Sequence, residues 1–128
     1  MRNEPDDSAR PIKAALARVP LADIPDFGAI SLDVSFPSGR QSVVVTRRGD
    51  SVTAFINRCP HARWPLDTFD GRFLFTPDNS LVCAAHGAVF DPMSGACLGG
   101  PGTGAALTTI ATTRDGDEVI LSASSLSL

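Results

Sequence analysis

Two cysteine–histidine pairs constrain this chain more than any other feature of its sequence. The 128 residues include only two histidines and three cysteines, yet each histidine closely follows a cysteine, as Cys59-x-His61 and Cys83-x-x-His86. Either histidine would fall two or three positions after a cysteine by chance in roughly 5% of cases. Thiolate sulfur and imidazole nitrogen are both good ligands for iron and zinc. The two pairs therefore indicate one metal site, to which each of two loops contributes a sulfur and a nitrogen.

The local sequence of each pair suits such a site. In the segment CPH, residues two apart in an extended chain share a face, and Pro60 stiffens the turn between them. The segment CAAH is one residue longer, and Gly87 after it is expected to allow close approach of the backbone. Both loops are therefore expected to aim their sulfur and nitrogen in the same direction.

The grouping of the ligands helps to choose between metals. A zinc finger usually takes its two cysteines from one element and its two histidines from another. Here each loop supplies one of each. A [2Fe–2S] centre with two cysteines on one iron and two histidines on the other fits this grouping better. Zinc remains an alternative.

The rest of the chain has the pattern of β-strands. Residues 29–36 alternate between apolar and small or polar side chains, the period of a strand with one buried face. Residues 41–48 contain a β-branched run, and residues 51–58 follow after Gly49-Asp50, so these two segments predict a hairpin. Shorter apolar runs follow, separated by turn residues, at 73–75, 81–83 and 88–90, with two more strands around Asp115–Asp117.

The predicted fold is therefore all-β and antiparallel, with seven to ten short strands. The first 20 residues are polar and contain three prolines, so residues 1–20 are expected to be a flexible tail, with a short helix over residues 12–19. Residues 21–128 are expected to form a single domain, which is the usual organisation for a chain of this length.

Composition and charge exclude several classes of function. With 11 basic and 14 acidic residues the net charge is −3, and no basic block is present that would follow a phosphate backbone. No apolar run approaches the ~18 residues needed to span a membrane. The polar N-terminal segment MRNEPDDSAR lacks the apolar core of a secretory signal, so a cytoplasmic location is expected. Nucleic acids and membranes are thus not expected as partners.

The motifs closely resemble those of the Rieske [2Fe–2S] family. That family has C-x-H, a spacer and C-x-x-H, followed by glycine and a downstream glycine–proline loop; this chain has CPH, CAAHG, DPMSG and GGPGTG. The resemblance covers about residues 56–104, and the flanking strands agree with the family's β-sandwich. The spacer is longer than the commonest form, which suggests an extended hairpin, FDGRFLFTPDNS, between the loops.

The resemblance implies a Rieske-type antiparallel β-sandwich with a small cluster-binding subdomain of two loops. It implies one [2Fe–2S] cluster per chain, with Cys59 and Cys83 as thiolate ligands and His61 and His86 as imidazole ligands through Nδ1. Gly100-Pro101 would be the loop that covers the cluster.

Departures from the high-potential members of the family are informative. Those members join the two loops with a disulfide, whereas Trp64 and Ala85 stand at the matching positions here. They also place a serine and a tyrosine where this chain has Ala88 and Phe90, which have no hydroxyl to donate to sulfur. We therefore expect a potential in the low part of the Rieske range, around −150 to 0 mV.

Cys97 is expected to be a buried or half-buried free thiol.

The implied function is one-electron transfer by a ferredoxin component that feeds an oxygenase or related redox enzyme. Its partners would be a reductase, an oxygenase or a catalytic subunit. Rieske oxygenases also need a mononuclear iron held by two histidines and a carboxylate, and both histidines are already used here, so we expect no catalytic residue in this chain. Two alternatives remain: the small subunit of a larger oxidoreductase such as nitrite reductase, and a zinc-binding interaction domain without redox function.

Some residues near the motifs have simpler interpretations. Trp64 is the single tryptophan, and in a small protein such a residue is more often packed than used for docking. Arg58 and Arg63 flank the first pair and are expected to be ordinary surface arginines. Asp67 and Asp91 are expected to cap turns rather than transfer protons.

Overall fold

A computed structural model describes residues 15–37, 39–60, 64–68, 70–84, 87–100 and 105–122. Within these ranges the chain forms ten β-strands and one short 3-10 turn at Leu21–Asp23, and every strand pairing is antiparallel. The prediction of an all-β, antiparallel fold is confirmed. No helix in the described residues is long and apolar enough to cross a membrane.

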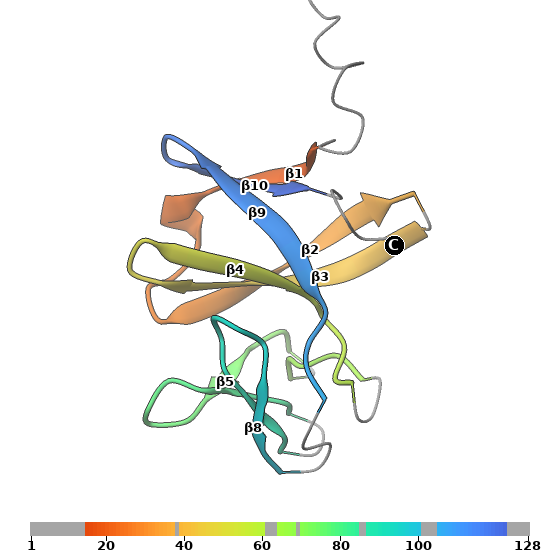
Figure 1. The fold of residues 1–128 in the computed structure, drawn as a ribbon, viewed down its shortest axis with the longest axis vertical. Coiled ribbons are helices and arrows are strands. Elements are labelled where there is room, and N and C mark those ends of the chain that lie inside the picture. The colour runs from red at the N-terminus through yellow and green to blue at the C-terminus, as the bar shows by residue number, and fades with distance from the viewer. Residues whose placement is uncertain are drawn as a thin grey trace, which may run out of the picture.

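Six strands form the larger sheet, which occupies the upper part of Figure 1. In order across the sheet they are β1 (Ala15–Pro20), β10 (Glu118–Ser122), β9 (Thr109–Asp115), β4 (Ser51–Ile56), β3 (Gly39–Arg48) and β2 (Gly28–Phe36). The two edge strands contribute to the same buried cluster, through Val19 of β1 and Val34 of β2. The sheet therefore curls around this cluster, which we call the inner core.

Four short strands form a second sheet below the first (Figure 1). They are β5 (Leu74–Phe75), β6 (Leu81–Val82), β7 (Val89–Phe90) and β8 (Cys97–Gly99). The apolar runs predicted β5, β6 and β7. Strand β8 was not predicted, because its three residues are too few to show a period and end in glycine.

Strand β3 explains how the two sheets pack. Val43, Val44 and Val45 are all fully buried, although successive side chains of a strand point to opposite faces. Val43 and Val45 belong to the inner core, whereas Val44 joins a second cluster that includes Phe90 of the small sheet. A continuous apolar run is expected where a strand is covered on both faces. The small sheet therefore rests on the outer face of the large one, and we call this second cluster the site core.

The predicted helix over residues 12–19 is wrong where the structure describes that range. Residues 15–20 form β1, in which Val19 lies opposite Val119 of β10. Alanine and leucine have high helix propensity, but propensity is a small effect, and strand pairing with burial of Val19 outweighs it. Of the predicted tail, residues 15–20 thus belong to the large sheet, and residues 1–14 lie outside the described residues.

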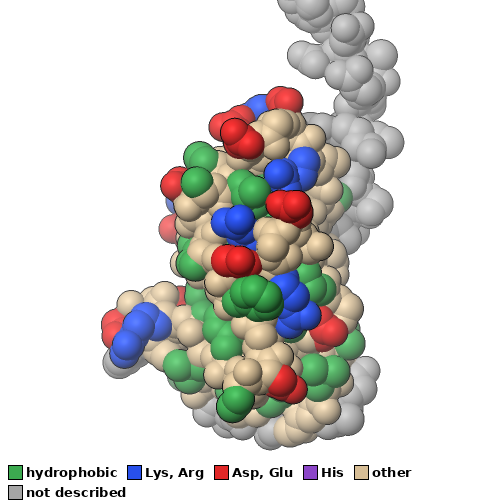
Figure 2. Space-filling model, turned by 90° about the vertical axis from the view of Figure 1, so that its left-hand side faces the viewer, with side chains coloured by type: hydrophobic (Ala, Val, Ile, Leu, Met, Phe, Trp, Pro, Cys, Tyr) green, Lys and Arg blue, Asp and Glu red, His purple; other side chains and the backbone are tan. Residues whose placement is uncertain are grey.

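The surface has a mixed charge distribution. Figure 2 shows acidic and basic side chains interspersed on the face that it draws, with hydrophobic side chains scattered among them. An exposed charge cluster joins the strand ends: Arg18 pairs with Asp115 at 3.0 Å and with Glu118 at 2.9 Å. The hydrogen bond that Arg18 donates to the carboxylate of Glu118 is the main reason that the pKa of Arg18 is raised above its usual value. Exposed pairs of this kind contribute little to stability.

Candidate metal centre

The first cysteine begins a closed loop directly after β4. Cys59 is fully buried, and its backbone N–H donates a 2.8 Å hydrogen bond to the carbonyl of Trp64. We call residues 59–66 the first loop. His61 belongs to this loop in the sequence but lies outside the described residues.

The second cysteine begins a loop of the same kind between β6 and β7. Cys83 is fully buried, and its N–H donates a 2.8 Å hydrogen bond to the carbonyl of Ala88. Residues 83–88 are the second loop, in which His86 lies outside the described residues. Both loops are thus closed by a bond from the cysteine to the fifth residue after it, and in each sequence the histidine falls inside that span.

Gly87 follows the second histidine and has a left-handed backbone conformation. Its N–H donates a 2.8 Å hydrogen bond to the carbonyl of Cys83. Among the described residues, a Cβ at Gly87 would meet no heavy atom within 4 Å, so these neighbours do not by themselves require glycine there. Its φ of +77° is the reason for glycine, since this left-handed conformation carries a steric cost for other residues.

A backbone hydrogen bond joins the two loops. The N–H of Ala84, next to Cys83, donates to the carbonyl of Leu66 at 3.0 Å. Cys59, Leu66 and Cys83 all belong to the site core. The structure therefore brings together the two residues that were predicted to supply sulfur.

A third loop packs against the second. It runs from Cys97, whose N–H donates to the carbonyl of Ala105 at 3.2 Å. In this loop Gly100 has a φ of +82°, and a Cβ there would lie 3.0 Å from both the Cα of Ala88 and the carbonyl oxygen of Gly87. Only glycine permits this contact. Pro101, the other residue of the predicted covering loop, lies outside the described residues.

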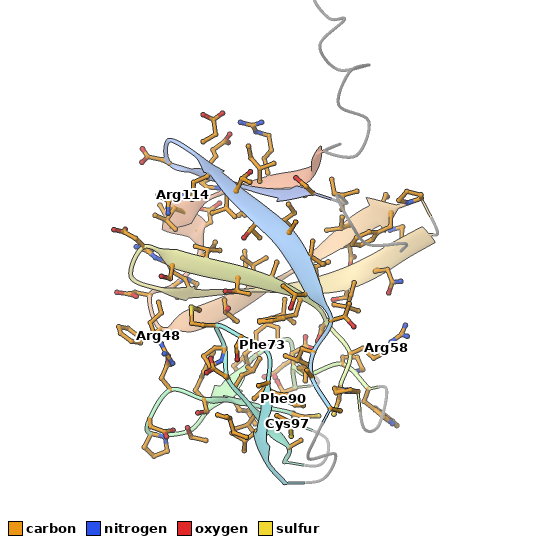
Figure 3. All side chains as sticks on the ribbon, in the orientation of Figure 1. Arg48, Arg58, Phe73, Phe90, Cys97 and Arg114 are labelled. Carbon is orange, nitrogen blue, oxygen red and sulfur yellow. The ribbon has the colours of Figure 1, made fainter. Side chains whose placement is uncertain are left out.

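The site core is apolar among the residues that the structure describes. Besides Cys59 and Cys83, its buried members are Val44, Phe55, Leu66, Leu81, Ala88, Phe90 and Leu107. Figure 3 shows Phe90 and Cys97 within the small sheet, with Arg58 and Arg48 at opposite sides of the molecule. A site of this kind excludes water from the cysteine sulfurs. Ala88 and Phe90 are buried there without a hydroxyl group, in agreement with the sequence.

Trp64 departs from its prediction, whereas Cys97 agrees with its prediction. Trp64 is 60% exposed, so the expectation that it is packed is wrong. Its backbone closes the first loop while its ring projects outward. Cys97 is a half-buried free thiol, as expected, and its Sγ lies 3.5 Å from the carbonyl oxygen of Gly99. Arg58 is exposed, which agrees with an ordinary surface arginine.

Asp91 and Asp67 were both expected to cap turns, but they make different contacts. Asp91 caps a turn as expected, since its Oδ1 accepts hydrogen bonds from the N–H groups of Met93 at 2.8 Å and Ser94 at 3.2 Å. Asp67 instead accepts a hydrogen bond from the side chain of Asn57 at 3.2 Å.

Sequence reasoning missed Asn57. This side chain is only 7% exposed, and its Oδ1 accepts the N–H of Leu66 at 2.7 Å. The signal was a polar residue that directly follows the apolar run Ala54–Ile56 and precedes the first cysteine by two positions. Its importance becomes visible only through its contacts.

The donor set fits a metal group that needs sulfur and nitrogen from two sides. Two buried cysteines lie in one apolar cluster, each at the start of a loop whose sequence contains one histidine. The loops are closed by equivalent hydrogen bonds and joined to each other. Two thiolates and two imidazoles are the ligands that iron and zinc both accept.

Comparison with known proteins distinguishes between these possibilities. A family model described as the Rieske [2Fe-2S] domain matches residues 23–114. The ferredoxin of carbazole 1,9a-dioxygenase from Nocardioides aromaticivorans IC177 is 25% identical, with a TM-score of 0.66, over 86% of this chain and 96% of that chain. A Sphingomonas yanoikuyae B1 ferredoxin is 22% identical, with a TM-score of 0.61, over 86% and 97%.

A third similar structure comes from a different enzyme system. It is a putative nitrite reductase NADPH small subunit, 22% identical, with a TM-score of 0.60, over 85% of this chain and 96% of that chain. Comparison with curated protein sequences gave no match.

Proposed function

This chain belongs to the Rieske [2Fe-2S] domain family, and from that premise we propose that it is a ferredoxin component that delivers single electrons to an oxygenase. Members of the family bind one [2Fe–2S] cluster per domain and transfer electrons through it. Both properties therefore hold for this chain. The ligands, the potential and the partner are the parts that we propose here.

We propose Cys59 and Cys83 as the thiolate ligands of one iron, and His61 and His86 as the imidazole ligands of the other. The observation that carries this assignment is the equivalent closure of the two loops, each by a bond from the cysteine to the fifth residue after it. It is supported by the burial of both cysteines in one apolar cluster. When bound, the cluster supplies a one-electron redox couple.

The residues around the cysteines favour a low potential. Hydroxyl donors to cluster sulfur stabilise the reduced, more negative state and so raise the potential. Ala88 and Phe90 are buried beside the cysteines and have no such donor. The potential is therefore around −150 to 0 mV, in the low part of the Rieske range.

The exposed side chains near the site suit transient docking. Trp64 is 60% exposed on the first loop, and Leu98 is 56% exposed on β8, which leads into the third loop. A small apolar contact with a polar surround is typical of short-lived electron-transfer complexes. The partners are a reductase that supplies the electron and an oxygenase component that receives it. The ferredoxin of carbazole 1,9a-dioxygenase, which this chain matches over almost its full length, supports that assignment.

A second candidate is the small subunit of an enzyme such as nitrite reductase, because a protein so described has the same fold. An obligate subunit buries a large apolar surface against its partner. Four large hydrophobic side chains are exposed in the described part of the chain, and they come from four separate segments: Phe27, Trp64, Leu74 and Leu98. So few exposed apolar side chains in the described residues favour the carrier over an obligate subunit. A cytoplasmic location accompanies the proposal, since the free thiol of Cys97 suits a reducing compartment.

Purified protein tests the proposal. We expect two iron and two acid-labile sulfide per chain, a brown colour, and bleaching of the visible spectrum by dithionite. A colourless protein with stoichiometric zinc would contradict electron transfer. A redox titration above about +200 mV would contradict the low potential alone. Capture of native partners, followed by a test of whether the reduced protein passes electrons to them, separates a carrier from a fixed subunit.

A further inference from the structure

Asn57 is a buried side chain whose polar atoms are all hydrogen-bonded. It follows the last residue of β4 and precedes Cys59 by two positions. Its Oδ1 accepts the N–H of Leu66 at 2.7 Å. Its Nδ2 donates to Ser42 Oγ at 3.1 Å and to Asp67 Oδ1 at 3.2 Å. A buried amide with this many partners is held in one orientation.

These bonds connect the large sheet to both loops of the site. The backbone N–H of Asn57 donates to the carbonyl of Ser42 on β3 at 2.8 Å, which fixes the residue to the sheet. Its side chain then holds Leu66, and the carbonyl of Leu66 accepts the N–H of Ala84 at 3.0 Å. Ala84 is the neighbour of Cys83. One side chain therefore links the end of the first loop to the start of the second.

We propose that Asn57 is a positioning residue that sets the distance and orientation between the two ligand-bearing loops. This inference rests on the proposed function, because it takes Cys59 and Cys83 as ligands. It adds a residue outside both motifs that acts through Leu66 and Ala84 rather than by contact with the cluster.

The chemistry of the site explains why asparagine suits it. Leu66 requires an acceptor, whereas Asp67 requires a donor, and an amide supplies both on one planar group. An aspartate at position 57 would keep the acceptor, lose the donor and face the carboxylate of Asp67. A leucine there would leave the buried N–H of Leu66 without a partner, which costs more than the loss of an exposed hydrogen bond.

The test compares three variants with a matched control. Asn57→Leu removes the hydrogen bonds of the side chain to Leu66 and Asp67, and Asn57→Asp removes only the donor to Asp67. The double variant Asn57→Asp with Asp67→Asn restores the bond between positions 57 and 67 with donor and acceptor exchanged, and it leaves the net charge unchanged. Thr46→Val is the control. Thr46 is fully buried, and its hydroxyl also donates from the large sheet to the small subdomain, at the carbonyl of Pro92, which lies outside both cysteine loops.

The readouts are the rate of cluster loss to an iron chelator and the EPR spectrum of the reduced protein. We expect Asn57→Leu to lose its cluster about tenfold faster than Thr46→Val, equivalent to about 1.4 kcal/mol, and to show broadened EPR lines. The exchanged pair should return to within about twofold of the wild-type rate, as expected for a restored hydrogen bond. Far-UV circular dichroism checks that each variant is folded.

Equal rates for Asn57→Leu and Thr46→Val, with unchanged EPR lines, would overturn the inference. If Asn57→Leu does not fold, Asn57→Asp is compared with the double variant. Failure of the double variant to recover the wild-type rate of cluster loss also overturns the inference. These failures leave the proposed function intact when the wild-type protein contains iron and sulfide. A wild-type protein without them overturns the proposed function itself.

Discussion

The N–H of Ala84 donates a 3.0 Å hydrogen bond to the carbonyl of Leu66, and this bond joins the two loops that contain the cysteine–histidine pairs. Where high-potential members of the family use a disulfide, this chain has Trp64 and Ala85. Backbone hydrogen bonding, supported by Asn57, therefore links the loops in the described structure. A hydrogen bond is weaker than a covalent bridge, so the buried residues around it carry more of the stability.

Substitution of the cysteines should separate ligands from the remaining thiol. Cys59→Ser and Cys83→Ser should each abolish the brown colour and the bound iron, because a serine hydroxyl is a poor substitute for thiolate. Cys97→Ser should keep the full cluster, since Cys97 is half-buried on β8 and bonds to Gly99. Iron and sulfide analysis measures the effect. Retention of the cluster by Cys59→Ser would show that the ligand assignment is wrong.

Restoring hydroxyl groups near the cysteines should raise the potential. Ala88→Ser and Phe90→Tyr each introduce a donor into the apolar site core, where both parent residues are buried. We expect an increase of some tens of millivolts for either variant and a larger one for both together. Spectroelectrochemical titration measures it, with Phe75→Tyr, at the margin of the site core, as the control. An unchanged or lower potential in the double variant would contradict the explanation based on missing donors.

The third loop should depend on Gly100 and tolerate a change at its neighbour. Gly100→Ala places a Cβ 3.0 Å from the backbone of Gly87 and Ala88, at a φ of +82°. We expect a loss of about 1–3 kcal/mol in the free energy of unfolding and a less stable cluster. At Gly99 a Cβ meets nothing within 4 Å among the described residues, so Gly99→Ala should change stability by less than about 0.5 kcal/mol. Thermal denaturation of both variants is the measurement, and equal stabilities would refute the packing argument.

Arg48, Asn79 and Phe27 form a hydrogen-bonded group between the large sheet and the small subdomain. We expect this group to fix the orientation of the subdomain relative to the large sheet. Arg48 donates to both the side-chain and backbone oxygens of Asn79, at 3.2 and 3.1 Å, and Asn79 Nδ2 donates to the carbonyl of Phe27 at 3.0 Å. Phe27 and Asn79 are also the non-glycine residues with positive φ in the described chain, at +58° and +67°.

We expect Asn79→Ala to destabilise the protein by about 2 kcal/mol, because it loses these bonds and keeps the left-handed backbone. Asn79→Gly also loses the side-chain bonds but adopts a φ of +67° without strain, so it should cost about 1 kcal/mol less. Denaturant unfolding compares the two. A larger loss for glycine than for alanine would argue against backbone strain at this position.

The stability of the protein at acid pH should depend on two threonine–aspartate hydrogen bonds in exposed turns. A hydrogen bond from Thr76 is the main cause of the lowered pKa of Asp78, and one from Thr68 is the main cause of the lowered pKa of Asp70. A carboxyl whose folded pKa lies below its unfolded value stabilises the protein above the unfolded value. That contribution is lost as the pH falls through the folded pKa.

Thr76→Val should therefore raise the pKa of Asp78 towards its ordinary value and leave that of Asp70 unchanged, while Thr68→Val does the reverse. NMR titration of the carboxyl carbons across the acid range resolves the two. If either substitution changes the pKa of both Asp70 and Asp78, the two shifts have a shared electrostatic origin rather than separate local hydrogen bonds.

Sequence periodicity predicted most of the large sheet. The alternation in residues 29–36 and the Gly49-Asp50 turn predicted β2, β3 and β4 within a few residues. These signals are local, because a strand with one buried face or a tight turn imposes its pattern on neighbouring residues. Strands β1 and β8 carry no such pattern: β1 is specified by pairing with β10, and β8 by pairing with Phe90 of β7.

The sequence by itself determined the chemistry of the site: which sulfur and nitrogen atoms are available, and their spacing along two loops. It could do so because ligand type and spacing are properties of short segments. Only the tertiary structure decided what holds those loops together, since Asn57, Leu66 and Ala84 come from separate segments of the chain and meet through hydrogen bonds. It also decided that Trp64 is exposed. Burial and long-range bonding depend on how the two sheets pack, and no local pattern records that.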